Sequence, residues 1–247
     1  MTQYKQQLMK GASMTDTTNT EAALIGREVR TGSRDGRSTK IAVARRTYSA
    51  DQHDLWDALT NPERIPRWFL PVEGDLRVGG RYQLVGNAGR VVERCDGPSS
   101  FAATWEMGDM VSWLEVTLTP AEEGTTLELV HEAFVDPDLW GQFGPSAVGI
   151  GWDLGLLGLG MHLASGESVD PELAANFLTW PEGIEFARAS ASGWADAASA
   201  DGDDPAQARE AAERTVAAYT AAPESEPGSD SEAQSEPESP HGDPAGS

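Results

Sequence analysis

Alternating apolar and polar residues in the middle of the chain predict a series of β-strands. In residues 111–119, Leu114 and Val116 fall on one face, and Leu127 does the same in residues 125–134. Because most connections between the predicted strands are short, we expect antiparallel neighbours in one sheet with an apolar face. The predicted strands cover residues 41–48, 76–85, 90–95, 101–107, 111–119 and 125–134.

Two short helices are predicted between the first and second strands. Asp51 is placed to cap the first helix, and Asn61 is placed to cap the second, which covers residues 62–67 and begins at a proline. The strand that follows carries Gly79 and Gly80, a pair that suits a bulge or a sharp bend. A sheet bent in this way can curl around an internal space.

Residues 145–164 are the only long apolar segment that we predict to be helical, and we expect this helix to cover the apolar face of the sheet. A membrane span is disfavoured because Asp153 lies near the centre and no Lys or Arg flanks the segment closely. Each glycine costs about 1 kcal/mol of helix stability relative to alanine, so glycines here indicate either close packing or an open space beneath the helix. They are Gly149, Gly151, Gly155, Gly158 and Gly160.

The two ends of the chain differ in composition from the middle. Residues 1–39 are predicted to be a polar, disordered leader without the apolar core of a secretory signal, and Met14 is an alternative start of translation. After a domain at residues 40–165, Asp-Pro pairs predict two or three helices in residues 166–221. Residues 222–247 contain no Lys or Arg and are rich in Pro, Ser, Gly and acidic residues, so we expect a disordered acidic tail.

Charge and cysteine content disfavour several functional classes. The net charge of −22 disfavours binding to nucleic acid or to an anionic membrane, because phosphates would be repelled. The single cysteine, Cys95, excludes an intramolecular disulfide and fits a reducing compartment, so we expect a cytoplasmic protein. The four histidines lack the spacing of metal ligands, and we expect neither a metal nor another cofactor.

Five stretches of the sequence, in their order and spacing, resemble one known family. They are LWDALTNPERIPRWF, DLRVGGRYQLVG, GRVVERCDGPSSFAATWEM, VSWLEVTLTPAEEGTTLELVHEAF, and Trp140 with the helix that follows it. Over residues 41–164 the chain resembles the Aha-type (activator of heat-shock-protein ATPase) C-terminal-domain-like family of the START-like, or SRPBCC, superfamily. The resemblance implies an α+β helix-grip fold, in which a curved antiparallel sheet grips a long C-terminal helix around a cavity. The helices expected beyond residue 165 depart from the simplest members of that family.

The function that the resemblance implies is binding of a small hydrophobic or amphipathic ligand in the cavity. One alternative is a polyketide cyclase or dehydratase that uses the same cavity. Another is a co-chaperone-like or regulatory interaction protein whose protein partner binds the C-terminal extension. The candidate ligand-binding residues, with the first two at the mouth, are Trp68, Phe69, Tyr82, Leu84, Trp105, Leu114, Val116, Leu127, Leu129, His131, Trp152, Leu156 and Leu159.

His131 and Asp153 are the two candidate catalysts. His131 shares a strand face with Leu127 and Leu129 and would point into the cavity, but no nucleophile or orienting acid accompanies it, which favours a structural histidine. Asp153 is either an acid with a raised pKa that faces the pocket or a residue on the solvent side of its helix, and we favour the solvent side. No catalytic residue is therefore assigned, and binding is favoured over catalysis.

Overall fold

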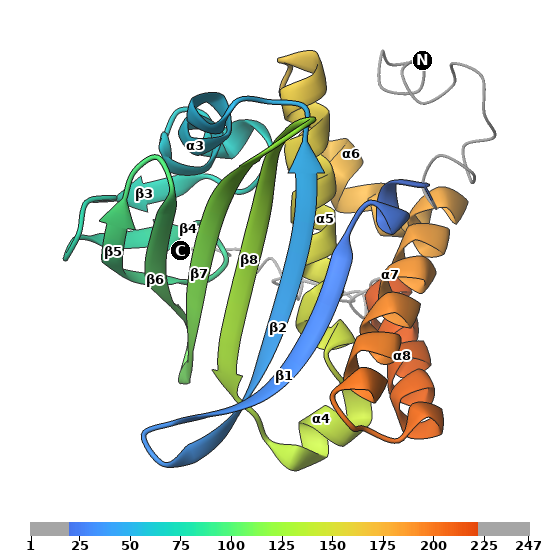
Figure 1. The fold of residues 1–247 in the computed structure, drawn as a ribbon. Coiled ribbons are helices and arrows are strands. Elements are labelled where there is room, and N and C mark those ends of the chain that lie inside the picture. The colour runs from blue at the N-terminus through green and yellow to red at the C-terminus, as the bar shows by residue number, and fades with distance from the viewer. Residues whose placement is uncertain (1–19, 222–247) are drawn as a thin grey trace, which may run out of the picture.

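The computed structural model describes residues 20–221 and has an α+β fold built on one antiparallel sheet (Figure 1). The strands lie in the order β1-β2-β8-β7-β6-β5-β4-β3, so β1 and β3 form the two edges. The pairing of β2 with β8 brings together strands that are far apart in the sequence. The strands are β1 Gly26–Arg34, β2 Arg37–Tyr48, β3 Val72–Gly74, β4 Arg81–Leu84, β5 Gly89–Asp96, β6 Ser100–Met107, β7 Met110–Ala121 and β8 Gly124–Phe134.

The long helices gather at the β1–β2 end of the sheet (Figure 1). Helix α5, Ser146–Ser165, packs on β2, and α7, Pro181–Ala200, packs on both β1 and α5. Helix α8, Pro205–Thr220, packs in turn on α7. The predicted covering helix and the predicted additional helices are therefore present. The other helical segments are α3 Gln52–Thr60, η1 Ile65–Arg67, α4 Pro137–Phe143, α6 Pro171–Asn176 and η2 Phe177–Thr179.

Cross-strand pairs confirm the predicted apolar face of the sheet. Strands β7 and β8 pair Val116 with Leu129 and Leu118 with Leu127, and all four side chains are buried. Burying one such side chain stabilises the fold by about 1.5–3 kcal/mol. A slip of one residue would turn this apolar set toward solvent, so burial fixes the register of the two central strands.

The prediction of a disordered leader is wrong for residues 20–39. Strand β1 pairs with β2 along its whole length. It lacks apolar alternation because it is an edge strand, and its polar side chains bond to one another and to β2: Glu28 contacts both Arg30 and Arg45. The rest of the predicted leader, residues 1–19, and the predicted acidic tail lie outside the described residues.

Two other predicted elements are shorter than expected. The strand predicted at residues 76–85 is reduced to β4, because residues 75–80 form a loop in which Gly79 has a φ of 79°. The helix predicted at residues 62–67 is a turn followed by η1. A helix that begins at residue 62 would need the N–H of residue 66 to donate to the carbonyl of residue 62. Pro66 has no N–H, which accounts for the shorter element.

The glycines of α5 permit close packing. A Cβ atom at Gly149 would lie 2.3 Å from Nε1 of the buried Trp194 on α7, and a Cβ at Gly158 would lie 2.8 Å from the carbonyl oxygen of Trp68. Of the two explanations left open by the sequence, close packing holds at these two positions. Within residues 20–221, α5 is the one helix long and apolar enough to cross a bilayer by length and composition, and here it packs against β2 and α7.

Candidate ligand-binding cavity

A cavity of about 150 Å³ lies between the β3–β8 part of the sheet and the segment that joins α3 to β3. Strands β3 to β8 each contribute to its wall, whereas α5 contributes only Trp152. This asymmetry follows from the position of α5, which packs on β2 rather than on the strands that surround the cavity. The cavity is therefore closed mainly by the connection between α3 and β3.

Residues 64–69, here called the roof segment, close the cavity between α3 and α5. The rings of Trp68 and Phe69 stack with their centroids 5.3 Å apart. Trp68 Nε1 donates to the carbonyl of Ala58 on α3 at 2.9 Å. A Cβ at Gly155 on α5 would lie 3.5 Å from the Phe69 ring, which is an ordinary contact. Both aromatic side chains are half-buried, and both line the cavity.

Most polar side-chain groups in the wall already have partners within the protein. The Tyr82 hydroxyl donates to the carbonyl of Thr104 at 2.8 Å, and the Thr60 hydroxyl donates to the carbonyl of Trp56 at 2.8 Å. Burial raises the pKa of Tyr82, so its phenol stays neutral. A ligand that buries an unpaired polar group here would lose about 1–3 kcal/mol. The wall therefore selects an apolar ligand.

Nine of the thirteen candidate ligand-binding residues line the cavity, and four do not. Leu127, His131, Leu156 and Leu159 are buried elsewhere in the core. Leu156 packs in the main hydrophobic core, and its carbonyl accepts from the Tyr48 hydroxyl of β2 at 2.9 Å. The nine residues that line the cavity are Trp68, Phe69, Tyr82, Leu84, Trp105, Leu114, Val116, Leu129 and Trp152.

Sequence reasoning missed the other half of the wall. The alternation that places Trp105 on the inner face of β6 also places Phe101 and Ala103 there, so these two residues could have been predicted. The contribution of Leu76 comes from a loop and has no periodic signal. The residues missed are Leu59, Thr60, Ile65, Val72, Leu76, Val92, Cys95, Phe101 and Ala103.

A chain of hydrogen bonds beside the cavity holds the His131 ring in place. Trp152 Nε1 donates to His131 Nδ1 at 3.1 Å, so the ring proton is on Nε2, which donates to Ser112 Oγ at 2.8 Å. The Ser112 hydroxyl donates in turn to the carbonyl of Trp105 at 2.7 Å. Burial lowers the pKa of His131 to about 4. Both nitrogens are occupied, so the ring orients Trp152 and Ser112 and has no free lone pair for a general base.

Both interpretations of Asp153 from the sequence are wrong, because the side chain faces neither solvent nor the cavity. It is fully buried and pairs with Arg27 of β1, whose Nε lies 2.8 Å from Oδ2. Trp194 Nε1 and Ser190 Oγ of α7 also donate to Oδ2. Burial raises the pKa of the Asp153 carboxyl, and Arg27 opposes that effect. The residue therefore ties α5 to β1 and to α7.

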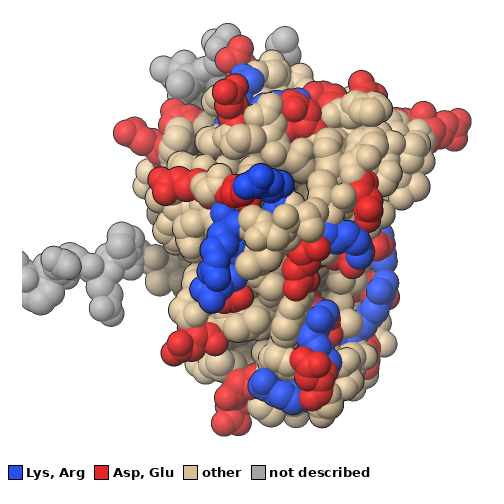
Figure 2. Space-filling view, turned by 90° about the vertical axis from the view of Figure 1, so that its left-hand side faces the viewer, with Lys and Arg blue, Asp and Glu red and all other residues tan. Residues whose placement is uncertain are grey.

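Charged side chains of both signs are interspersed on the face shown in Figure 2. On the strands around the cavity, Arg94 contacts Glu115 at 2.6 Å and Arg90 contacts Glu106 at 3.3 Å. Exposed pairs of this kind contribute little to stability, because water and salt screen them. Within the part of the chain that the structure describes, no group of three or more His, Cys, Asp or Glu side chains is placed to hold a metal ion.

The fold is α+β, and comparison with known proteins identifies a family that part of the chain resembles. Residues 49–153 match the family model described as Activator of Hsp90 ATPase homolog 1-like protein, so this part of the chain is similar to that START-like family. The matched part runs from just before α3 to the middle of α5. It therefore includes every strand and loop that lines the cavity.

Two solved structures of CalU16 from Micromonospora echinospora are similar over a longer part of the chain. The crystal structure is 29% identical with a TM-score of 0.53, and covers 70% of this chain and 97% of that chain. The solution NMR structure is 27% identical with a TM-score of 0.62, and covers 72% of this chain and 96% of that chain. No curated protein matches this chain.

Proposed function

We propose that the protein binds a small apolar molecule, about the size of one aromatic ring, in the cavity beneath Trp68 and Phe69. The observation that carries the proposal is the cavity itself, with a volume of about 150 Å³ and walls built mainly of aromatic and aliphatic side chains. Engineered cavities of about 150 Å³ lined by Leu, Ile and Phe stay dry and bind benzene. The similarity to START-like proteins supports the same class of function.

The size of the cavity limits what it accepts without a change of shape. Sites for drug-sized ligands have volumes of about 300–1,000 Å³, which is about two to seven times the volume here. A fatty acyl chain or a multi-ring compound would therefore require the roof segment to move outward. The protein in its present conformation favours a single ring over these larger amphipathic molecules.

A pair of neighbouring alanines on β6 tests the proposal. Ala103 is buried and lines the cavity, whereas Ala102 lies on the opposite face of the same strand. Titration calorimetry with benzene, toluene and indole should detect binding to the wild-type protein and to Ala102→Leu. Ala103→Leu fills part of the cavity and should weaken binding by about tenfold or more, equivalent to about 1.4 kcal/mol. Absence of binding by all three compounds, or equal affinity of the two variants, would refute the proposal.

An acid–base enzyme has less support from the described residues. Neither His131 nor Asp153 lines the cavity, and the phenol of Tyr82 is kept neutral by burial. A cyclase or dehydratase needs a positioned group that exchanges a proton with its substrate. Binding without chemistry therefore fits this wall better. A role for the C-terminal extension in binding a protein partner stays a prediction, testable by pull-down with a chain truncated after Ala222.

A further inference from the structure

A polar cleft of about 500 Å³ lies where β3, β4, β5 and the end of β6 meet. Its volume falls in the range of about 300–1,000 Å³ that is typical of small-molecule sites. The cleft is distinct from the apolar cavity, and of the described residues only Tyr82 lines both. Its charged and amide side chains are Glu73, Arg81, Gln83, Arg90 and Glu106.

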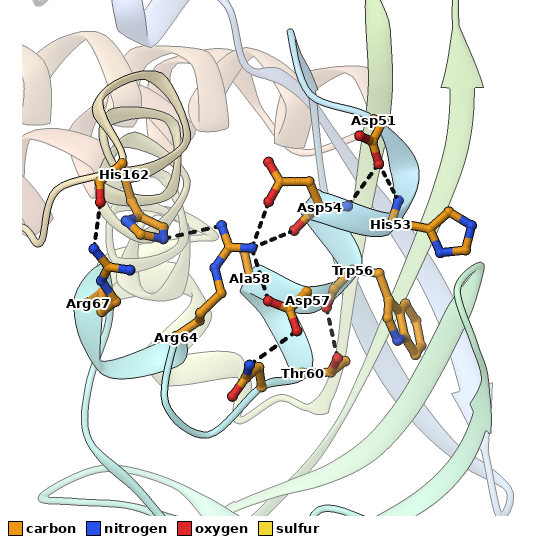
Figure 3. Close-up of polar contacts among 12 residues, drawn as sticks. Asp51, His53, Asp54, Trp56, Asp57, Ala58, Thr60, Arg64, Arg67 and His162 are labelled. Carbon is orange, nitrogen blue, oxygen red and sulfur yellow. Dashed lines mark hydrogen bonds and ion pairs between the residues drawn. The ribbon is translucent and has the colours of Figure 1, made fainter.

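Arg81 brings an unpaired positive charge to the cleft. Most other arginines are held by carboxylates of the same chain, as Arg64 is held by Asp54 and Asp57 of α3 (Figure 3). The side chain of Arg81 is exposed, and within residues 20–221 it makes neither a hydrogen bond nor an ion pair. All five N–H donors of its guanidinium are therefore available to a ligand.

An unusual backbone conformation brings Arg90 to the same cleft. Val92 lines the apolar cavity, so regular alternation along β5 would place Arg90 on that inner face. Instead, Arg90 has a φ of 136°, which residues other than glycine rarely adopt, and its Nε lies 3.3 Å from Oε2 of Glu106. Glu106 follows Trp105, which lines the cavity, so Glu106 belongs to the outer face of β6. The guanidinium of Arg90 therefore lies outside the cavity.

The guanidinium of Arg90 keeps free donors beside its contact with Glu106. That contact uses Nε, and within the described residues the two Nη groups of Arg90 have no partner. On the same strand, Arg94 uses both Nε and an Nη group, on Asp96 and Glu115. Strained non-glycine residues such as Arg90 are concentrated at binding and active sites. Two guanidiniums with free donors thus line one cleft.

We propose that the cleft binds a small molecule that carries one carboxylate or phosphate group, held between Arg81 and Arg90. A guanidinium binds either oxyanion through paired N–H···O bonds. The two arginines are balanced formally by Glu73 and Glu106, so the cleft does not favour a polyanion such as a nucleic acid. This binding does not depend on the ligand proposed for the apolar cavity.

NMR titration that follows the Nε–H resonance of each arginine tests the cleft. Sodium acetate and inorganic phosphate are the two probes, added at constant pH and constant ionic strength. The resonances of Arg81 and Arg90 are assigned from their loss in Arg81→Gln and Arg90→Gln. We expect saturable shifts of both resonances in the millimolar range with at least one probe, and binding about tenfold weaker or more in either variant. The probe that binds more tightly identifies the preferred group as carboxylate or phosphate.

Two further variants serve as controls. Arg77 is exposed, contacts Asp75 at 2.7 Å and does not line the cleft, so Arg77→Gln should bind both probes as the wild type does. Arg90→Gly adopts a φ of 136° without strain, so it preserves the backbone of β5 and should still lose binding. Absence of a saturable shift with both probes, or unchanged binding in Arg81→Gln or Arg90→Gly, would overturn the proposal. An equal loss of binding in Arg77→Gln would also overturn it, because the probes would then respond to overall charge.

Discussion

Replacing Gly149 with alanine is predicted to destabilise the protein by about 2–4 kcal/mol. The new Cβ would stand 2.3 Å from Trp194 Nε1, so the buried indole must move by about 1 Å to reach an ordinary contact distance. That movement breaks the bond of 3.2 Å from Nε1 to Asp153, and a bond to a charged group contributes about 1.5–3 kcal/mol. Overpacking adds about 1–3 kcal/mol, and the better helix propensity of alanine offsets about 1 kcal/mol.

Gly151, two residues further along α5, is the matched control. A Cβ there would lie 3.7 Å from the hydroxyl of Tyr219, an ordinary contact, so Gly151→Ala should be neutral or stabilise by up to about 1 kcal/mol. Urea unfolding followed by both tryptophan fluorescence and circular dichroism measures the two variants against the wild type. If Gly149→Ala unfolds at the same urea concentration as the wild type or at a higher one, the close contact between α5 and α7 is wrong.

Three further predictions concern single side chains. The pKa of His131 is about 4 in the folded protein, whereas the same side chain in an unfolded chain takes up its proton near pH 6.5. The free energy of unfolding should therefore fall by up to about 3 kcal/mol as the pH drops through this window. His131→Gln should not show this fall. Arg27→Met should lower the free energy of unfolding, measured in urea, by about 3–5 kcal/mol because it leaves the buried Asp153 without its cationic partner. Replacing the exposed Arg30 by Met should cost under about 1 kcal/mol. Cys95 should be alkylated by iodoacetamide in the folded protein, and the reaction should be slower with saturating toluene. Mass spectrometry measures both rates, and equal rates with and without toluene would contradict the place of Cys95 in the wall.

Much of the sheet could be predicted because its inner strands are buried on one face. The pattern in β7 and β8 assigns Val116 and Leu129 to the inner side, and both line the cavity. Strand β1 has no such pattern, since it is an edge strand whose side chains are mostly polar. Its position depends on pairing with β2 and packing against α7, and neither is visible in its own residues.

The face that α5 presents to the cavity could not be predicted from its residues. The helix is apolar all round, so periodicity cannot say which side meets the sheet and which meets α7. Asp153 illustrates the difficulty, because its partners Arg27 and Ser190 lie 126 and 37 positions away in the sequence. For the same reason, the sequence pattern predicted that Leu156 and Leu159 line the cavity, although they pack elsewhere in the core.

Anomalous diffraction from a xenon-pressurised crystal tests the binding cavity most directly. Xenon enters apolar cavities of about 150 Å³ and needs no polar partner. The proposed function predicts one strong xenon peak beneath Trp68 and Phe69, in contact with Leu114, and a much weaker peak in Ala103→Leu. A crystal with no peak at this position, or with its main peak outside the wall described here, would contradict the cavity as the binding site.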